Sequence, residues 1–190
     1  MARWQPGARE RLVVAAVDLF AEHGYDTTTV AQIAERAGVT KSTFFRHFPD
    51  KRELLVAGQD ALSTLLAEGI TEAPAAATPL QAVAAGLERA TDTMGPMNRE
   101  LAPRLKAAIA SSTELQERDA LKSVGLAKAM ADALLARGVP APVAHLAAEL
   151  GLLAFKQGFE SWTAVDDDSS LATHTTTALE SLKAATNALT

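Results

Sequence analysis

The 190-residue sequence contains no cysteine. This absence excludes disulfide bonds, thiolate metal ligands and cysteine nucleophiles, and a reducing compartment is the natural environment of such a chain. Long apolar runs are also missing, because charged residues interrupt every stretch that approaches the length of a membrane-spanning helix. Near the amino terminus, Asp18 and Glu22 break up the apolar run that a secretion signal would need. We therefore expect a cytoplasmic protein without a membrane segment.

The motifs of common enzymes are absent as well. The sequence has no glycine-rich phosphate loop, no G-x-S-x-G elbow and no H-E-x-x-H pair. Its histidines share no metal-ligand spacing and lie at His23, His47, His145 and His174. Three consecutive aspartates, Asp166 to Asp168, precede Ser169, which suits a helix amino terminus better than a metal site. The sequence thus predicts a protein that is not an enzyme, with no catalytic residue, no cofactor and no metal.

Charge is distributed unevenly along this acidic chain. Residues 1–52 contain eight Lys or Arg and six Asp or Glu, whereas the remaining residues contain ten and seventeen. A cationic segment on an anionic protein is expected where only one end meets a polyanion. A chance imbalance of this size is an equally good explanation on charge alone.

Apolar residues recur at helical spacing along nearly the whole chain, as in Val13, Ala16, Val17 and Phe20. Neither this run nor the next alternates as a strand would. Breaks rich in proline, glycine or serine separate the helical segments and lie near residues 72–80, 95–96, 111–113 and 137–140. The pattern predicts an all-α fold of about nine helices.

Residues 28–48 have the pattern of a helix-turn-helix. Thr29 and Gln32 form a capping-box pair at the start of one helix, Gly38 supplies a tight turn, and Thr40 caps a short second helix. A further helix is expected to open at Pro49-Asp50. Helix-turn-helix units place the start of their second helix in the major groove of DNA. Many helical proteins with a glycine turn never bind nucleic acid, so the pattern alone leaves both interpretations open.

The segment FAEHGYDTTTVAQIAERAGVTKSTFFRHFPDKRELL strongly resembles the amino-terminal part of the TetR family of bacterial transcriptional regulators over about residues 9–56. The resemblance implies a three-helix DNA-binding domain at residues 1–50 and a ligand-binding and dimerisation domain at residues 51–190. It also implies a homodimer that binds a double-stranded DNA operator. By position, the residues that would contact phosphates are Thr29, Thr40, Thr43, His47 and Lys51. Those that would meet base edges or nearby phosphates are Gln32, Lys41, Ser42 and Arg46.

Phe45 departs from the pattern of this family, in which many members have tyrosine at the position and use its hydroxyl to reach a phosphate. Phenylalanine lacks that hydrogen bond, although its ring can pack on the DNA backbone or on a thymine methyl group. Phe44 is the better candidate for a core residue of the pair. Ala31 is too short to read a base beyond an apolar contact.

Two patterns in the carboxyl-terminal part suggest a dimer interface. Small residues recur at helical spacing at Ala147, Gly151, Ala154 and Gly158, a stripe on which another helix can pack closely. The last segment has a heptad-like repeat that includes Leu171, Ala178, Leu182, Ala185 and Leu189. Both patterns are equally compatible with packing inside one chain, and the family resemblance favours the interface.

A ligand pocket would have to form among the helices of residues 79–165. The large or adaptable apolar side chains there are Met94, Met97, Leu105, Ile109, Met130, Phe155, Phe159 and Trp162. Plain core packing is an alternative for all of them. This part also resembles, weakly, TetR-type regulators of acyl-CoA or mycofactocin systems, which implies a hydrophobic or acyl-CoA-like effector. Its charged head group would have possible partners in Arg104, Lys106, Arg118 and Lys122, although solvent exposure explains each of these charges equally well.

The sequence therefore predicts a ligand-responsive repressor that a small hydrophobic effector releases from a palindromic operator. The alternative is a helical small-molecule-binding or interaction module without sequence-specific DNA binding.

Overall fold

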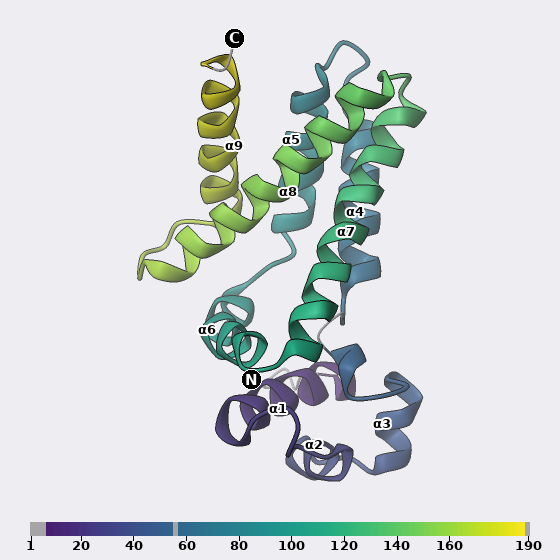
Figure 1. Cartoon of the computed structure of the whole chain (residues 1–190), viewed down its shortest axis with the longest axis vertical. Helices are drawn as coiled ribbons and strands as arrows, with labels where there is room; N and C mark the ends of the chain where they lie inside the picture. Colours follow the sequence, from purple (N-terminus) through teal and green to yellow (C-terminus); the bar gives the residue numbers. More distant parts are fainter. Residues whose placement is uncertain (1–6, 55–56, 189–190) are drawn as a thin grey trace, which may run out of the picture. The chain divides into compact units, whose positions relative to one another are not determined.

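The computed structural model describes residues 7–54 and 57–188, and these residues form nine α-helices, one 3-10 turn and no strand (Figure 1). The all-α prediction is confirmed. The elements, in chain order, are α1 (Ala8–His23), α2 (Val30–Arg36), α3 (Lys41–His47), η1 (Arg52–Leu54), α4 (Gln59–Glu72), α5 (Pro79–Thr91), α6 (Pro96–Ala110), α7 (Thr113–Ala136), α8 (Ala141–Ala164) and α9 (Leu171–Asn187). None of these helices combines the length and the apolar character that crossing a membrane requires.

The helices form two compact units. The first comprises the described parts of Met1–Ala57 together with Leu101–Leu121, so it includes the second half of α6 and the start of α7. The second comprises the described parts of Gly58–Glu100 and Lys122–Thr190. Whether residues 1–50 act as a separate DNA-binding domain stays a prediction.

The first unit is built around a core that α1, α2 and α3 share with α6 and α7. Phe20, Ile33 and Phe44 are buried in it, as are Ala108 of α6 and Leu115 of α7. Burying apolar side chains of this size contributes about 1.5–3 kcal/mol each for the large ones. The helix-turn-helix at the amino terminus therefore folds with the help of residues that follow it by more than fifty positions.

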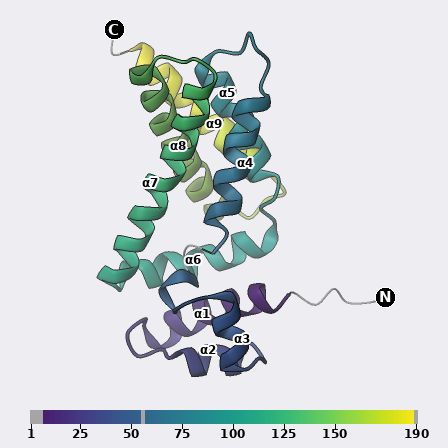
Figure 2. The same ribbon diagram turned by 90° about the vertical axis from the view of Figure 1, so that its right-hand side faces the viewer.

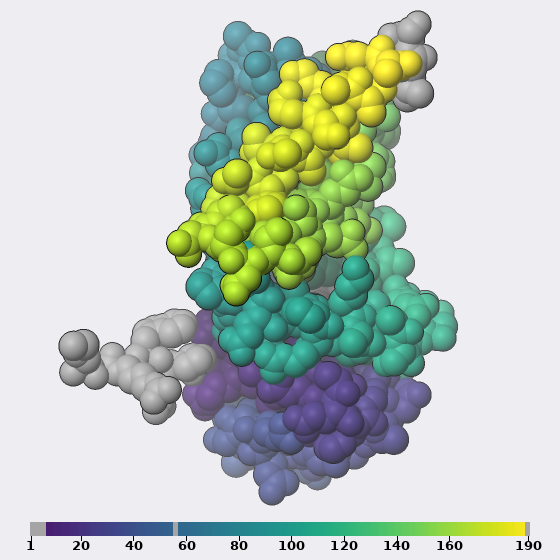
Figure 3. Space-filling view, turned by 90° about the vertical axis from the view of Figure 1, so that its left-hand side faces the viewer, coloured from purple at the N-terminus to yellow at the C-terminus, as the bar shows by residue number. Residues whose placement is uncertain are grey.

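The second unit consists of the packed helices α4, α5, α8 and α9 with the second half of α7 (Figure 2). Helices α4 and α5 pack so closely that a methyl group on Gly86 would lie 2.7 Å from the carbonyl oxygen of Leu66. Helix α9 lies along one face of this unit, beside the carboxyl-terminal part of α8 (Figure 3). Leu179 of α9 belongs to the apolar core of this unit, and Leu171 is buried as well.

One helix boundary differs from the prediction. Asp50 accepts backbone N–H bonds from Arg52 at 2.8 Å and Glu53 at 3.2 Å, as a capping residue does. The segment that it caps is the 3-10 turn, and α4 begins only at Gln59, after Gly58 with a φ of 89°. A capping pattern predicts where a helical turn begins, but the length of the helix that follows depends on tertiary packing.

Candidate nucleic-acid interface

Helix α2 begins at the predicted capping box. The Thr29 hydroxyl accepts a hydrogen bond from the Gln32 backbone N–H at 3.3 Å, and the Gln32 side-chain oxygen accepts from the Thr29 backbone N–H at 2.8 Å. The helix ends at a turn in which Gly38 has a φ of 66°, a left-handed conformation that glycine adopts without steric cost. The Val39 N–H donates to the Ala34 carbonyl at 2.9 Å and closes this turn.

Helix α3 is held in place by the aromatic residues on its inner side. Phe44 is fully buried, as predicted, and its ring lies 5.9 Å from the ring of the buried Phe48. Thr40 caps the helix by accepting the Thr43 backbone N–H at 3.1 Å. Because the inner side is fixed, the opposite side of this short helix must face outward.

The outward face of α3 carries Lys41, Ser42, Phe45 and Arg46, all of which are exposed. The helix contains no acidic residue, and the described residues hold no ion pair to Lys41 or Arg46. In contrast, Arg36 on α2 forms two hydrogen bonds to the Glu22 carboxylate, at 3.0 and 2.8 Å. Lys41 and Arg46 thus present positive charge that no carboxylate of this unit neutralises, which suits a polyanionic partner.

The predicted phosphate-contacting hydroxyl groups already have partners inside the protein. The Thr29 hydroxyl also donates to the Gln32 side-chain oxygen at 2.8 Å, and the Thr40 and Thr43 hydroxyl oxygens lie 3.0 Å apart. His47 is exposed at the end of α3. The structure therefore brings Lys41, Ser42, Phe45, Arg46 and His47 together on one short helix and gives the threonines a capping role.

Lys51 is not part of this face, and its side chain binds the loop between α1 and α2. Its ammonium group donates to the backbone carbonyl oxygens of Tyr25 at 2.7 Å and Thr28 at 3.0 Å, and it lies 4.0 Å from the centre of the Tyr25 ring. These contacts fix the loop between α1 and α2. Sequence reasoning did not find this role, because nothing in the local sequence indicates carbonyl partners 23 and 26 residues away.

Polar contacts join α6 and α7 to the same unit. The Tyr25 hydroxyl donates to a Glu114 carboxylate oxygen at 3.0 Å, and burial raises the pKa of Tyr25 far above its usual value, so the phenol stays a neutral donor. Arg118 forms an ion pair with Glu53 at 3.0 Å, and Arg104 pairs with Asp18. Arg104 and Arg118, candidates for binding a ligand head group, thus neutralise carboxylates of the amino-terminal segment.

The predicted pocket residues are divided between the two units. Leu105 and Ile109 pack against the core of the first unit, whereas the other six lie in the second unit. Met130 and Trp162 are buried there, Met94, Phe155 and Phe159 are partly buried, and Met97 is exposed. The rings of Phe155, Phe159 and Trp162 form a ladder along α8, with centroid distances of 6.2 and 5.9 Å.

The stripe of small residues on α8 packs inside the chain, which corrects the expectation that it faces a second subunit. Ala147, Gly151, Ala154 and Gly158 are all buried. A methyl group on Gly158 would lie 2.6 Å from the Thr175 Cα of α9, and one on Gly151 would lie 2.5 Å from a Val83 methyl group of α5. Small side chains are needed here so that α8 can approach α5 and α9 of its own unit.

The predicted residues of α9 show a graded exposure. Leu171 is buried, Ala178 and Leu182 are partly buried against the core, and Ala185 is exposed. Leu189 lies outside the described residues. The inner part of the heptad-like repeat is therefore intramolecular, and an interface role for its outer part stays a prediction.

Comparisons with known proteins agree with this geometry. Residues 12–57 match the family described as bacterial regulatory proteins, tetR family. The transcriptional regulator TcmR of Streptomyces glaucescens is 40% identical over 75 residues, which are 40% of this chain and 33% of TcmR. The chain spans about a third of the length of the first curated relatives that it matches.

Two solved structures share the fold of nearly the whole chain. SmeT of Stenotrophomonas maltophilia, in a complex with triclosan, has a TM-score of 0.59 and 21% identity, with 94% of this chain and 90% of that chain covered. The repressor FadR of Thermus thermophilus, in a complex with lauroyl-CoA, has a TM-score of 0.51 and 22% identity, with 90% and 91% covered. Residues 12–57, which include the capped helix-turn-helix and its cationic face, are therefore similar to the tetR family of bacterial regulatory proteins.

Proposed function

We propose that this chain is a transcriptional regulator of the TetR type, which binds a palindromic DNA operator as a homodimer in the bacterial cytoplasm and represses transcription. The observation that carries the proposal is the outward face of α3, where Lys41 and Arg46 have no carboxylate partner among the described residues. Two such helices about 34–36 Å apart would enter successive major grooves of one operator.

The proposed dimer uses a second face of α8, which adjoins the face of the small residues. Val143, Leu146 and Leu153 are exposed by 45%, 60% and 42%, and with the partly buried Leu150 they form an apolar ridge. These four residues recur at i, i+3, i+7 and i+10, the spacing of a coiled-coil seam. Helix α8 crosses in front of α5 in Figure 1, and among the described residues Val143, Leu146 and Leu153 stay exposed.

A second copy of this chain is the partner that fits the ridge. Two seams of this spacing can pair antiparallel about a two-fold axis, which is the symmetry that a palindromic operator requires. Glu149 and Lys156 are exposed on one flank of the ridge, seven residues apart. Exposed charges on a flank suit the polar rim of an interface whose apolar residues are buried at its centre.

For the effector, we propose a small hydrophobic molecule or an acyl-CoA that binds in the second unit. The partly buried rings of Phe155 and Phe159 and the adaptable side chain of Met94 support an apolar ligand. FadR and SmeT, which share this fold, are in complexes with lauroyl-CoA and triclosan. A ligand that binds better to a state with more widely separated recognition helices would release the operator.

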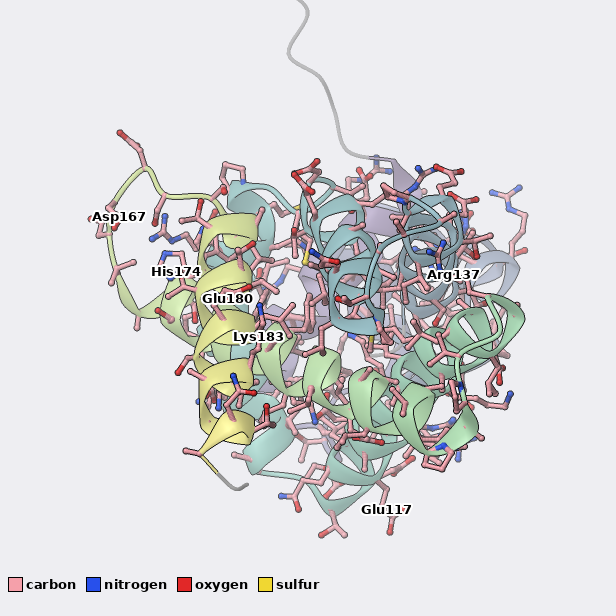
Figure 4. The ribbon with its side chains drawn as sticks, turned by 90° about the horizontal axis from the view of Figure 1, so that it is seen from above. Glu117, Arg137, Asp167, His174, Glu180 and Lys183 are labelled. Atoms are coloured by element: carbon pink, nitrogen blue, oxygen red, sulfur yellow. The ribbon has the colours of Figure 1, made fainter. Side chains whose placement is uncertain are left out.

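Replacing Lys41 by alanine is expected to weaken operator binding about tenfold, because a DNA-facing charge is lost. Lys183→Ala on α9 is the matched control, since Lys183 is exposed and pairs with Glu180 of its own helix at 3.5 Å (Figure 4). A mobility-shift titration with DNA selected from a random library measures both. Equal effects of the two substitutions would show that α3 is not the DNA-binding face.

Lys51→Met is expected to act through stability. The substitution keeps most of the side chain but removes the ammonium group from the carbonyls of Tyr25 and Thr28, so the free energy of unfolding should fall by about 2 kcal/mol. The slope of log affinity against log salt should stay unchanged, whereas Lys41→Met should reduce it by about 0.9 if Lys41 contacts a phosphate. A reduced slope without loss of stability would instead assign Lys51 to the phosphate backbone.

A helical small-molecule-binding module without sequence-specific DNA binding is the second candidate. It is favoured by the internal hydrogen bonds of Thr29, Gln32, Thr40, Thr43 and Lys51, which leave fewer polar groups for DNA. Failure to select any sequence from a random library, together with thermal stabilisation by an acyl-CoA, would establish this function instead.

A further inference from the structure

Phe45 is an exposed aromatic ring in the middle of a charged face. It is 57% exposed, although its neighbour Phe44 is fully buried, and the two rings meet edge to face with centroids 5.4 Å apart and an interplanar angle of 82°. This contact holds one edge of the Phe45 ring in place, while the rest of the ring is exposed to solvent. Exposing an aromatic ring at a fixed position costs hydrophobic free energy that a partner would recover.

The surroundings of Phe45 limit the chemistry of that partner. Lys41 lies one helical turn before Phe45, Ser42 three residues before it, and Arg46 directly after it, and all three are exposed. An apolar protein surface would bury the charges of Lys41 and Arg46 without water or a counter-charge, and burying an unpaired charge costs free energy. The partner must therefore be anionic around an isolated apolar spot.

In the major groove of DNA, the thymine methyl group is an apolar spot of this kind. Adenine, guanine and cytosine present hydrogen-bond donors and acceptors there, and thymine adds a C5-methyl group. Phenylalanine has no polar group to bind a phosphate, so its ring gains free energy only from the methyl group or from the sugar edges. Sugar contacts carry no sequence information, whereas the methyl group does.

We infer that Phe45 is a specificity residue that reads the C5-methyl group of one thymine in each half of the operator. The inference rests on the proposed function, because it requires that α3 enters the major groove. In this inference, the uncharged side chain of Phe45 determines which base the central part of α3 prefers. Lys41 and Arg46 supply the positive charge around that ring.

The test uses the full-length protein and the operator that it selects from a random DNA library. Each thymine of the operator is replaced in turn by uracil, which keeps the base pair and removes only the methyl group. At one position in each half-site, wild type should lose about fourfold in affinity, the value expected for one buried methyl group. Phe45→Ala should bind more weakly at every sequence and show no further loss at that position, and Phe45→Tyr should keep the loss.

Phe45→Ala should fold normally because the ring is largely exposed, and its melting temperature checks this. The inference is overturned if wild type selects an operator but no uracil substitution has an effect that depends on Phe45. It is also overturned if Phe45→Ala changes the oligomeric state instead, which would make the ring a protein contact. If wild type selects no sequence at all, the proposed function itself fails, and the two failures are thus distinguishable.

Discussion

Leu146→Glu is expected to convert the proposed dimer into a monomer and to weaken operator binding about a hundredfold. Leu146 is 60% exposed in the single chain, so glutamate should leave the fold intact. In the proposed dimer the same position is buried against the ridge of the second copy, where an unpaired carboxylate is strongly unfavourable. A monomer has only one recognition helix and loses the gain in affinity from binding two half-sites together. Sedimentation velocity measures the assembly, and mobility-shift titration measures the affinity.

Ala61→Glu is the matched control for this substitution. Ala61 is exposed on α4 of the same unit, and it also changes from an apolar side chain to glutamate. It should leave both the dimer and operator binding unchanged. A Leu146→Glu protein that stays dimeric would remove α8 from the interface and direct attention to the outer face of α9.

Gly86→Ala is expected to lower the free energy of unfolding by about 2 kcal/mol, which corresponds to roughly 4–8 °C in melting temperature for a chain of this size. The added methyl group would lie 2.7 Å from the Leu66 carbonyl oxygen and 2.9 Å from an Ile70 side-chain carbon. Gly69 faces the same crossing, where its methyl group would lie 2.7 Å from the Gly86 Cα. Helix α4 and helix α5 would have to separate, because the obstructing atoms include backbone.

Gly125→Ala separates this packing effect from the general effect of glycine in helices. Gly125 lies inside α7, and its added methyl group would meet only the end of the flexible Gln59 side chain. Gln59 can move aside, and alanine favours helix by about 1 kcal/mol over glycine. Differential scanning calorimetry should therefore find Gly125→Ala neutral or stabilising. Equal destabilisation of both variants would contradict the role of close approach at Gly86.

The fold class and the local structure of the helix-turn-helix follow directly from the sequence. Thr29, Gly38 and Thr40 have the predicted roles because capping and turn formation depend on residues three or four positions apart. The burial of Phe44 and the exposure of Phe45 were also anticipated. The start of α4 at Gln59 could not be predicted from capping patterns, because it depends on packing beyond the capping residue.

The faces of α8 could not be assigned from periodicity. A helical repeat identifies which residues share a face, but it does not tell whether that face meets the same chain or another one. The small residues at Gly151 and Gly158 are close to α5 and α9, while the ridge at Leu146 and Leu153 is exposed. The ridge has a heptad signal of its own in the sequence, and a search for a second periodic face on α8 would have found it.

The sequence predicts which residues lie at α3, but it does not predict their contacts. The family resemblance identifies Thr40, Lys41 and Arg46 by position, and the structure places all three at α3. It cannot indicate that Lys51 binds backbone carbonyls, because such partners depend on how the chain folds back on itself. Their roles toward DNA stay predictions that the substitutions above test.

The position of Leu115 in the core of the first unit affects how the protein folds during synthesis. The ribosome releases the chain from its amino terminus, so α1, α2 and α3 emerge before Ala108 and Leu115, which complete their core. Until α7 begins to emerge, the nascent segment exposes part of the apolar surface that Phe20 and Ile33 later bury, and it is a natural substrate for chaperones. The first unit thus completes its core only after its residues up to Leu115 have been translated.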